Sequence, residues 1–358
     1  MGAATARTLA ERGRSTVLLE RFTVGHDLGS SGGPTRIFRY NYAQPDYVAL
    51  VTIAAELWRE LEDAAGVELL RTTGGIDIGP GAREPAAAVA ASGIPIARMH
   101  PREVSERWPA LRVPDDAELY VHDGSGVLRA RPTVQALAGL AARAGAETRE
   151  GARVTRLRVV DGGVRIDVED GSVVRADAAV VTAGSWAPEV LAGAGIDLPV
   201  EPSLEQVSYF RLDEPAALPT LIERWDDGVH ADYAVPDPWD PGAFKVGLHQ
   251  GGVAVGLEPG ERPAEVDPDR LERSRAHATA RFAAHHETGE VDACLYTNTP
   301  DEDFVLDRVG PIVIVSACSG HGFKFVPLIG RIAADLATEA PPEVPIGRFR
   351  IGRPSLMR

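Results

Sequence analysis

The sequence is poor in two residue types, and each scarcity limits what the protein can be. Of its 37 basic residues only two, Lys245 and Lys324, are lysines, and its only cysteines are Cys294 and Cys318. Two cysteines are too few for a disulfide framework, so we expect a reducing, cytoplasmic setting. Each lysine either has no special role or lies where a compact ammonium is needed and a planar guanidinium does not fit.

Long apolar runs and an excess of positive charge are also missing. No run of about 18 apolar residues occurs, so we expect no membrane span. The N-terminal residues Arg7, Glu11, Arg12 and Arg14 interrupt the apolar core that an export signal would need. The net charge of -15 opposes binding to a phosphate backbone, so we expect no nucleic-acid partner. The net charge does not argue against small-molecule ligands.

The first twenty residues match the second half of a dinucleotide-binding βαβ unit. Small residues recur at helical spacing from Gly2 to Ala10, Gly13 closes the helix, and "STVLLE" predicts a buried strand that ends in Glu20. Such a unit begins with an apolar strand and a G-x-G-x-x-G turn, of which Gly2 can be only the last glycine. We therefore expect that the first strand of this unit is missing.

The rest of the chain alternates helical and β-rich segments. An amphipathic helix is predicted over 43–66, a β-meander over 152–184, mostly strand over 198–250 and a helix over about 267–286. Near the end, "IVIVSAC" is a second strand that leads through a glycine-rich turn into a helix, which places Gly320 and Gly322 beside a cofactor.

A sheet assembled from both ends of the chain, with an antiparallel domain inserted, suits a flavoprotein better than a simple nicotinamide enzyme. The fold class expected is α/β, with a Rossmann-like FAD-binding domain and an antiparallel-sheet substrate domain. The predicted division is 1–75 with 125–200 and 290–340 for FAD, 76–124 with 201–289 for substrate, and 341–358 as a C-terminal surface strand or strap.

Five stretches together resemble the monomeric sarcosine oxidase and N-methyltryptophan oxidase family of FAD-dependent amine oxidases. They are "MGAATARTLAERG", "GSSGGPTRIFRYNY", "AFKVGLH", "CLYTNTPDEDFVLD" and "SGHGFKF". Their order and spacing match the family over nearly the whole chain. The resemblance implies bound FAD, a monomer, a small amino acid as substrate and O2 as electron acceptor.

The residues expected to hold FAD lie in several of these stretches. The Gly2 amide would face the pyrophosphate, and Glu20 would accept hydrogen bonds from the ribose, unless it is a solvated acid at a strand end. The resemblance makes Cys294 the covalent link to the flavin, whereas a small buried hydrophobe is the alternative, which we assign to Cys318. The remaining expected flavin contacts are Ser30, Ser31, Thr35, Arg36, Trp186, Gly320, His321 and Gly322. The loop departs from many relatives at Gly32 and Pro34.

The resemblance also assigns the substrate side. Arg39 and Lys324 bind the substrate carboxylate, which a guanidinium fork suits, while Lys245 promotes the reaction with O2 through preorganised charge. His249 and Tyr233 flank the amine, although a structural histidine is an equal alternative. Because both lysines of the chain fall on these two positions, the functional interpretation of the lysines is favoured.

These features predict an FAD-dependent oxidase of a secondary amino acid, of the N-methyl or cyclic imino type. The products would be an imine, which hydrolyses to formaldehyde when the substrate is N-methylated, and hydrogen peroxide. The alternatives are an oxidase of a larger amine, such as a fructosyl amino acid or a pipecolate-like ring, and a flavin-free remnant that serves as an interaction module. No metal site is expected.

Overall fold

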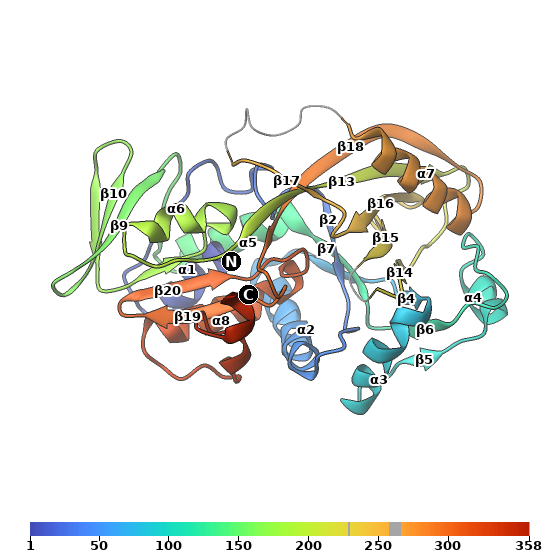
Figure 1. Ribbon diagram of the computed structural model, residues 1–358, viewed down its shortest axis with the longest axis horizontal. Coiled ribbons are helices and arrows are strands. Elements are labelled where there is room, and N and C mark those ends of the chain that lie inside the picture. The colour runs from blue at the N-terminus through green and yellow to red at the C-terminus, as the bar shows by residue number, and fades with distance from the viewer. Residues whose placement is uncertain (228–229, 258–265, 358) are drawn as a thin grey trace.

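Two groups of sheets make up the molecule. The computed structural model describes residues 1–227, 230–257 and 266–357. In Figure 1 the short parallel strands and their helices lie on the left, and one large sheet curves over the right side. The predicted α/β fold with two parts is therefore confirmed.

The parallel strands come from distant parts of the chain. Strand β1 (Val17–Leu19) pairs with β8 (Glu147–Arg149), and β12 (Ala179–Val181) pairs with β20 (Ile312–Ser316). Strand β19 (Val305–Val309) adds an antiparallel edge to the second pair. The hydrophobic pattern predicts one sheet assembled from both ends of the chain, but among the described residues β1 with β8 and β20 with β12 belong to two separate sheets.

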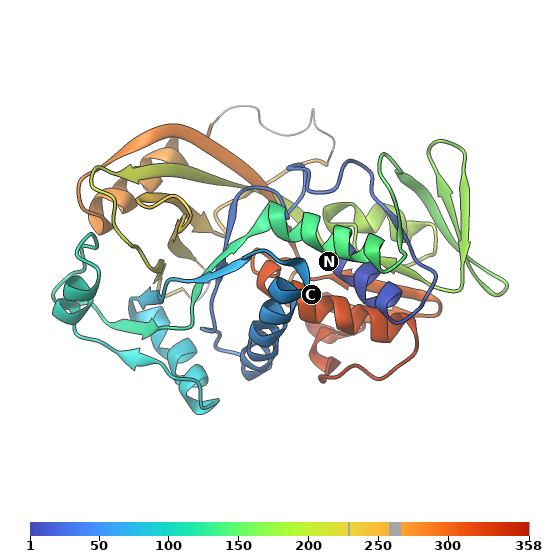
Figure 2. The same ribbon diagram turned by 180° about the vertical axis from the view of Figure 1, so that it is seen from behind.

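Close helix packing explains the small residues near the N-terminus. Helix α1 (Gly2–Glu11) packs between α5 (Ala130–Arg143) and α8 (Val326–Ala337), as Figure 2 shows from behind. A Cβ added at Gly330 of α8 would lie 2.7 Å from the Cβ of Ala4. Larger residues at this crossing would force the two helices apart.

The second part of the molecule is built on one large sheet. Within the described ranges it has nine strands, and β13 (Glu201–Leu212) lies against β16, β17 and β18. Its other strands are β4 (Gly75–Ile78), β5 (Ala97–Arg98), β6 (Leu119–His122), β14 (Thr220–Arg224), β15 (Ala231–Pro236), β16 (Ala243–His249), β17 (Val253–Ala254) and β18 (His285–Asn298).

The remaining elements connect or cover these sheets. A meander of β9 (Val154–Val160), β10 (Gly163–Val168) and β11 (Val173–Ala176) matches its prediction. A small sheet joins β2 (Thr35–Phe38), β7 (Gly126–Arg129) and β3 (Leu70–Thr72). The other helices are α2 (Pro45–Ala65), α3 (Arg83–Ala91), α4 (Pro101–Arg107), α6 (Ala187–Ala192) and α7 (Pro268–Arg281). The short 3-10 turns are η1 (Pro80–Ala82), η2 (Gly184–Trp186), η4 (Phe323–Phe325), η5 (Gly347–Phe349) and η6 (Pro354–Met357). None of the helices in the described ranges is both long enough and apolar enough to cross a membrane.

The helix predicted over 267–286 is too long at its C-terminal end. Helix α7 ends at Arg281, and β18 begins at His285. Phe282 leaves the helical conformation because its fully buried ring stacks on Phe244 at 4.2 Å. Strand β18 then pairs with β13 up to Asn298, so the predicted domain boundary at residue 290 falls inside one strand.

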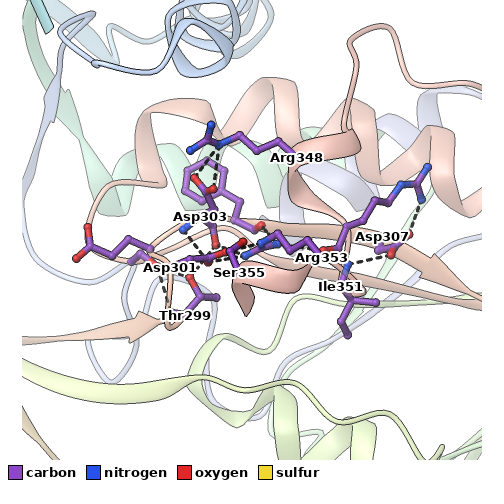
Figure 3. A network of polar contacts seen from close by, with 12 residues as sticks. Thr299, Asp301, Asp303, Asp307, Arg348, Ile351, Arg353 and Ser355 are labelled. Atoms are coloured by element: carbon purple, nitrogen blue, oxygen red, sulfur yellow. Dashed lines mark hydrogen bonds and ion pairs between the residues drawn. The ribbon is translucent and has the colours of Figure 1, made fainter. Parts of the chain in front are cut away.

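The C-terminal segment is anchored inside the protein. The predicted surface strand is not formed in the described part of 341–357, which holds two 3-10 turns. Figure 3 shows Arg353 donating to both carboxylate oxygens of Asp301, at 2.6 and 2.7 Å, and the Ser355 hydroxyl donates to the same carboxylate. Arg353 also donates to the Phe304 carbonyl at 2.8 Å. The segment is thus a strap held by buried charge.

We predict that Arg353→Met destabilises the protein by about 3 kcal/mol or more, because it leaves the Asp301 carboxylate buried without its cation. The midpoint of urea denaturation would measure this loss. Arg331→Met is the matched control, since the ion pair of Arg331 with Glu60 is exposed and contributes at most about 1 kcal/mol. Equal losses in the two variants would contradict the assignment of a buried anchor.

Candidate functional site

One large cavity lies where the two parts of the protein meet. Its volume is about 1520 Å³, more than the roughly 300–1,000 Å³ of an ordinary small-molecule pocket. Every site residue predicted from the sequence lines it, from Gly2 and Glu20 at one end to Arg39 and Lys324 at the other. The structure therefore brings the whole predicted set together.

The N-terminus of α1 forms one end of the cavity. No side chain caps this helix, so amides of its first turn remain available to a ligand. A Cβ at Gly2 would lie 2.7 Å from the Thr182 hydroxyl, which leaves room there for glycine only. Glu20 follows β1 and accepts a hydrogen bond from the Phe22 amide at 2.9 Å. Burial raises the pKa of Glu20, but hydrogen bonds from His26 and Phe22 outweigh it and lower the pKa overall.

The loop before β2 is closed by Arg36. Its guanidinium donates to the carbonyls of Thr35 at 2.8 Å and Ser30 at 3.0 Å, and also to that of Gly32. Ser30, Ser31 and Thr35 therefore lie in one folded turn on the cavity wall. The predicted loop contacts are placed together, and Arg36 holds the backbone of that loop.

Lys245 is buried in the middle of the cavity wall. It lies on β16, opposite Tyr209 of β13, and its ammonium donates to the Thr35 carbonyl at 2.8 Å. No described carboxylate forms an ion pair with it. Burial, and next the charge of Arg36, lower its pKa from 10.5 to about 7. A negatively charged ligand would therefore stabilise the protonated form of Lys245.

Arg39 and Lys324 form the cationic end of the cavity, and both contact Tyr42. The Arg39 guanidinium lies 4.3 Å from the centre of the Tyr42 ring, and Lys324 donates to the Tyr42 hydroxyl at 2.9 Å. Lys324 also donates to the His321 carbonyl, while its own carbonyl accepts from the indole of Trp58 at 2.7 Å. Helix α2 thereby fixes the turn that carries the lysine.

The two cations have no acidic partner among the described residues. Burial lowers the pKa of both Arg39 and Lys324; repulsion from Arg224 adds to the effect on Arg39, and repulsion from Arg39 adds to the effect on Lys324. Burying a charge without a counter-ion is unfavourable unless a ligand supplies one. The arrangement therefore suits a ligand that carries a carboxylate.

An aromatic wall with one histidine faces these cations. His249 contacts the Tyr296 hydroxyl at 3.4 Å, and Tyr233 lies on the neighbouring strand β15. Burial, followed by repulsion from Arg39, lowers the pKa of His249 to about 3, so the imidazole is neutral. Gly320 lies against the Tyr296 ring, since a Cβ there would lie 2.1 Å from it. Gly322 is equally constrained, because its Cβ would meet the Ala317 carbonyl.

His321 and Trp186 take opposite positions in the cavity. His321 is held by Tyr42 and by the Glu302 carbonyl, each at 3.2 Å, and stacks on Phe304. Its ring is therefore part of the support for Lys324. Trp186 packs edge-on against Phe22, near the Glu20 end.

The two cysteines differ in their surroundings. Cys294 lies on β18 and lines the cavity. Burial raises the pKa of its thiol, while Arg36 and Lys245 act in the opposite direction. Cys318 accepts a hydrogen bond from the Thr297 amide at 3.3 Å. Both thiols are free.

Comparison with known proteins identifies the family. A family model described as FAD dependent oxidoreductase matches residues 1–336. The chain belongs to the FAD-dependent oxidoreductase family. It is 30% identical to human peroxisomal sarcosine oxidase, with 99% of this chain and 94% of that protein covered. The monomeric sarcosine oxidase of Bacillus sp. (strain B-0618) gives the same identity and coverage.

Solved structures give the same result for the fold. NikD, an amino acid oxidase essential for nikkomycin biosynthesis, superposes with a TM-score of 0.86 at 25% identity, with 97% of this chain and 94% of NikD covered. Glycine oxidase from Geobacillus kaustophilus gives a TM-score of 0.80 at 21% identity, with 98% and 95% covered. The protein is thus an FAD-dependent oxidase that acts on CH–NH bonds of amino acids.

The cavity residues fit the cofactor of this family. The uncapped α1 terminus and Gly2 leave room for a pyrophosphate, and the Glu20 carboxylate is placed after β1, where such folds bind ribose. The described residues include no group of three or more His, Cys, Asp or Glu side chains that could hold a metal ion.

Several residues of the site were not singled out by the sequence. Tyr296, which lines the cavity, and Tyr42, which contacts Arg39 and Lys324, lie inside "CLYT" and "RYNY", so the resemblance contained them without identifying them. Arg224 lies in "TLIER", an ordinary strand sequence with no local signal, yet it lines the cavity beside Arg39.

Proposed function

We propose that the protein is an FAD-dependent oxidase of secondary amino acids, of the N-methyl or cyclic imino type. The observation that carries this proposal is the buried pair Arg39 and Lys324, which faces the cavity without a described acidic partner. A substrate carboxylate would supply the missing negative charge and orient the C–N bond. We further propose a monomer that works in the cytoplasm, a setting with which its two free cysteines agree.

The protein residues position the substrate for oxidation. Bound FAD supplies the chemistry, since it takes a hydride equivalent from the substrate and passes the electrons to O2. Arg39 and Lys324 hold the carboxylate, while Tyr233 and Tyr296 border the amine. Neutral His249 has one acceptor nitrogen, which can accept a hydrogen bond from the amine without adding a positive charge. The imine product then hydrolyses in water, and an N-methyl substrate yields formaldehyde.

Lys245 is assigned to the reaction with O2. Its ammonium is buried, and the Thr35 carbonyl holds it in place. A fixed positive charge in a dry site stabilises negative charge that develops on dioxygen. Lys324, in contrast, donates hydrogen bonds to the Tyr42 hydroxyl and the His321 carbonyl. We therefore assign the two lysines to separate steps of the reaction.

Cys294 is proposed to bind the flavin covalently as a thioether, in which its sulfur would replace one hydrogen of the 8α methyl group. The two electrons released would reduce the flavin ring and pass to O2. Arg36 and Lys245 favour the thiolate that such an attachment needs, although burial opposes it. Cys318 also lines the cavity, but its sulfur accepts a hydrogen bond from the Thr297 amide, and we do not assign it this role.

The first prediction tests the function itself. The protein loaded with FAD is mixed anaerobically with N-methyl and cyclic imino acids, and loss of the flavin absorbance is followed. Arg39→Met and Lys324→Met are each expected to lower kcat/KM by about 10- to 100-fold, because the carboxylate loses a charged hydrogen bond. Arg39→Lys should recover part of the loss, and Arg331→Met, far from the cavity, should behave as the native protein. Failure of every secondary amino acid to bleach the flavin would contradict the proposal and favour oxidation of a larger amine.

A second prediction separates the two lysines. Lys245→Met is expected to slow the reaction of reduced enzyme with O2 by about 100-fold or more, because the developing charge loses its stabilising ammonium. Anaerobic reduction by substrate should change by less than about threefold. Stopped-flow absorbance measures both steps, and Lys245→Arg, which keeps the charge, is the control. Unchanged reoxidation would refute the role.

A third prediction concerns the covalent link. After acid precipitation the native protein should stay yellow, whereas Cys294→Ala should release its flavin into the supernatant. Cys318→Ala is the matched control and should stay yellow, because its thiol has a structural partner. Release of flavin from the native protein would show that the cofactor is not covalently bound.

A further inference from the structure

Arg224 is a third cation at the carboxylate end of the cavity. It ends β14, lines the cavity, and donates from Nε to Asp77 at 2.7 Å. It also donates from Nη2 to the Asn41 carbonyl at 3.1 Å, and the same carbonyl accepts from Arg39. One backbone oxygen therefore holds two guanidinium groups side by side.

These cations have more donors than one carboxylate can use. After their hydrogen bonds to described residues, three N–H groups of Arg224, four of Arg39 and one of Lys324 remain. A single carboxylate has about four acceptor positions. Donors at the edge of a cavity that bind no protein group are satisfied by water or by a ligand, so a second acidic group fits beside the first.

The charges at the carboxylate end of the cavity also favour a second acidic group on the ligand. Asp77 is buried and is neutralised by Arg224, while the Asn41 amide completes its hydrogen bonds. Arg39 and Lys324 then remain without a counter-charge among the described residues, and burial lowers the pKa of Lys324. Negative charge from a ligand would stabilise both cations.

We propose that Arg224 determines specificity by binding a second carboxylate of the substrate, so that the preferred substrates are secondary amino acids with two carboxylates. This inference rests on the proposed oxidase function and narrows its substrate class. The Nη edge of Arg224, beside Arg39, receives the second carboxylate, while the first lies between Arg39 and Lys324.

The test compares substrates that differ only in charge. The FAD-loaded enzyme is assayed for peroxide with N-methylaspartate and N-methylasparagine, and with N-methylglutamate and N-methylglutamine. In each pair, kcat/KM is expected to be at least about 10-fold higher for the acid than for the amide. Arg224→Gln should bring this ratio close to one, mainly by raising KM for the acid.

A control separates binding from support of the fold. Arg224→Gln leaves Asp77 without its cation, so Asp77→Asn/Arg224→Gln restores neutrality and should keep the ratio close to one. Asp77→Asn alone keeps Arg224 and should keep the preference for the acid. If Arg224 only neutralises Asp77, the double variant would regain the native ratio, which would overturn the proposal.

The two proposals fail in different ways. If no secondary amino acid reduces the flavin, the oxidase function is wrong. If the amides and N-methylglycine are oxidised as efficiently as the dicarboxylic substrates by the native enzyme, the function stands and the role of Arg224 is wrong. This comparison needs no variant, so a misfolded Arg224→Gln protein would not prevent a decision.

Discussion

The buried cations Arg39 and Lys324 both contact Tyr42, and the rest of the site depends on this arrangement. Burial raises the pKa of Tyr42 to about 12, so its hydroxyl stays neutral and can accept from Lys324 while its ring carries Arg39. Neither neutral partner cancels a charge. The unfavourable desolvation is therefore offset when an anion enters, so these buried cations are the electrostatic basis of the proposed binding of a substrate carboxylate.

The long antiparallel strands bring distant residues into this field. Strand β13 pairs with β16, which carries Lys245 and His249, and on its other side with β18, which carries Cys294 and Tyr296. Because side chains alternate along a strand, the register decides which of them face the cavity. A shift of one residue would turn the lysine and the cysteine away from it.

Much of the fold could be predicted from the sequence, and so could sixteen of the residues that line the cavity. The helix α1, the strand before Glu20 and the turn after β20 carry local patterns, and the two lysines stood out because lysine is so rare. Arg224 could not be found, since its role comes from tertiary contacts with Asn41 and Asp77 rather than from its neighbours in the chain. The end of α7 was misplaced for a similar reason, because ring stacking of Phe282 overrides the helical periodicity.

The strap also supports the backbone that holds His321. Arg353 binds Asp301 and the Asp303 carbonyl, and the intervening Glu302 supplies the carbonyl that holds His321. Glu302 has a φ of 60°, a strained backbone that its surroundings must maintain. Removing the strap would free this backbone, so residues beyond Glu339 stabilise the cavity without lining it.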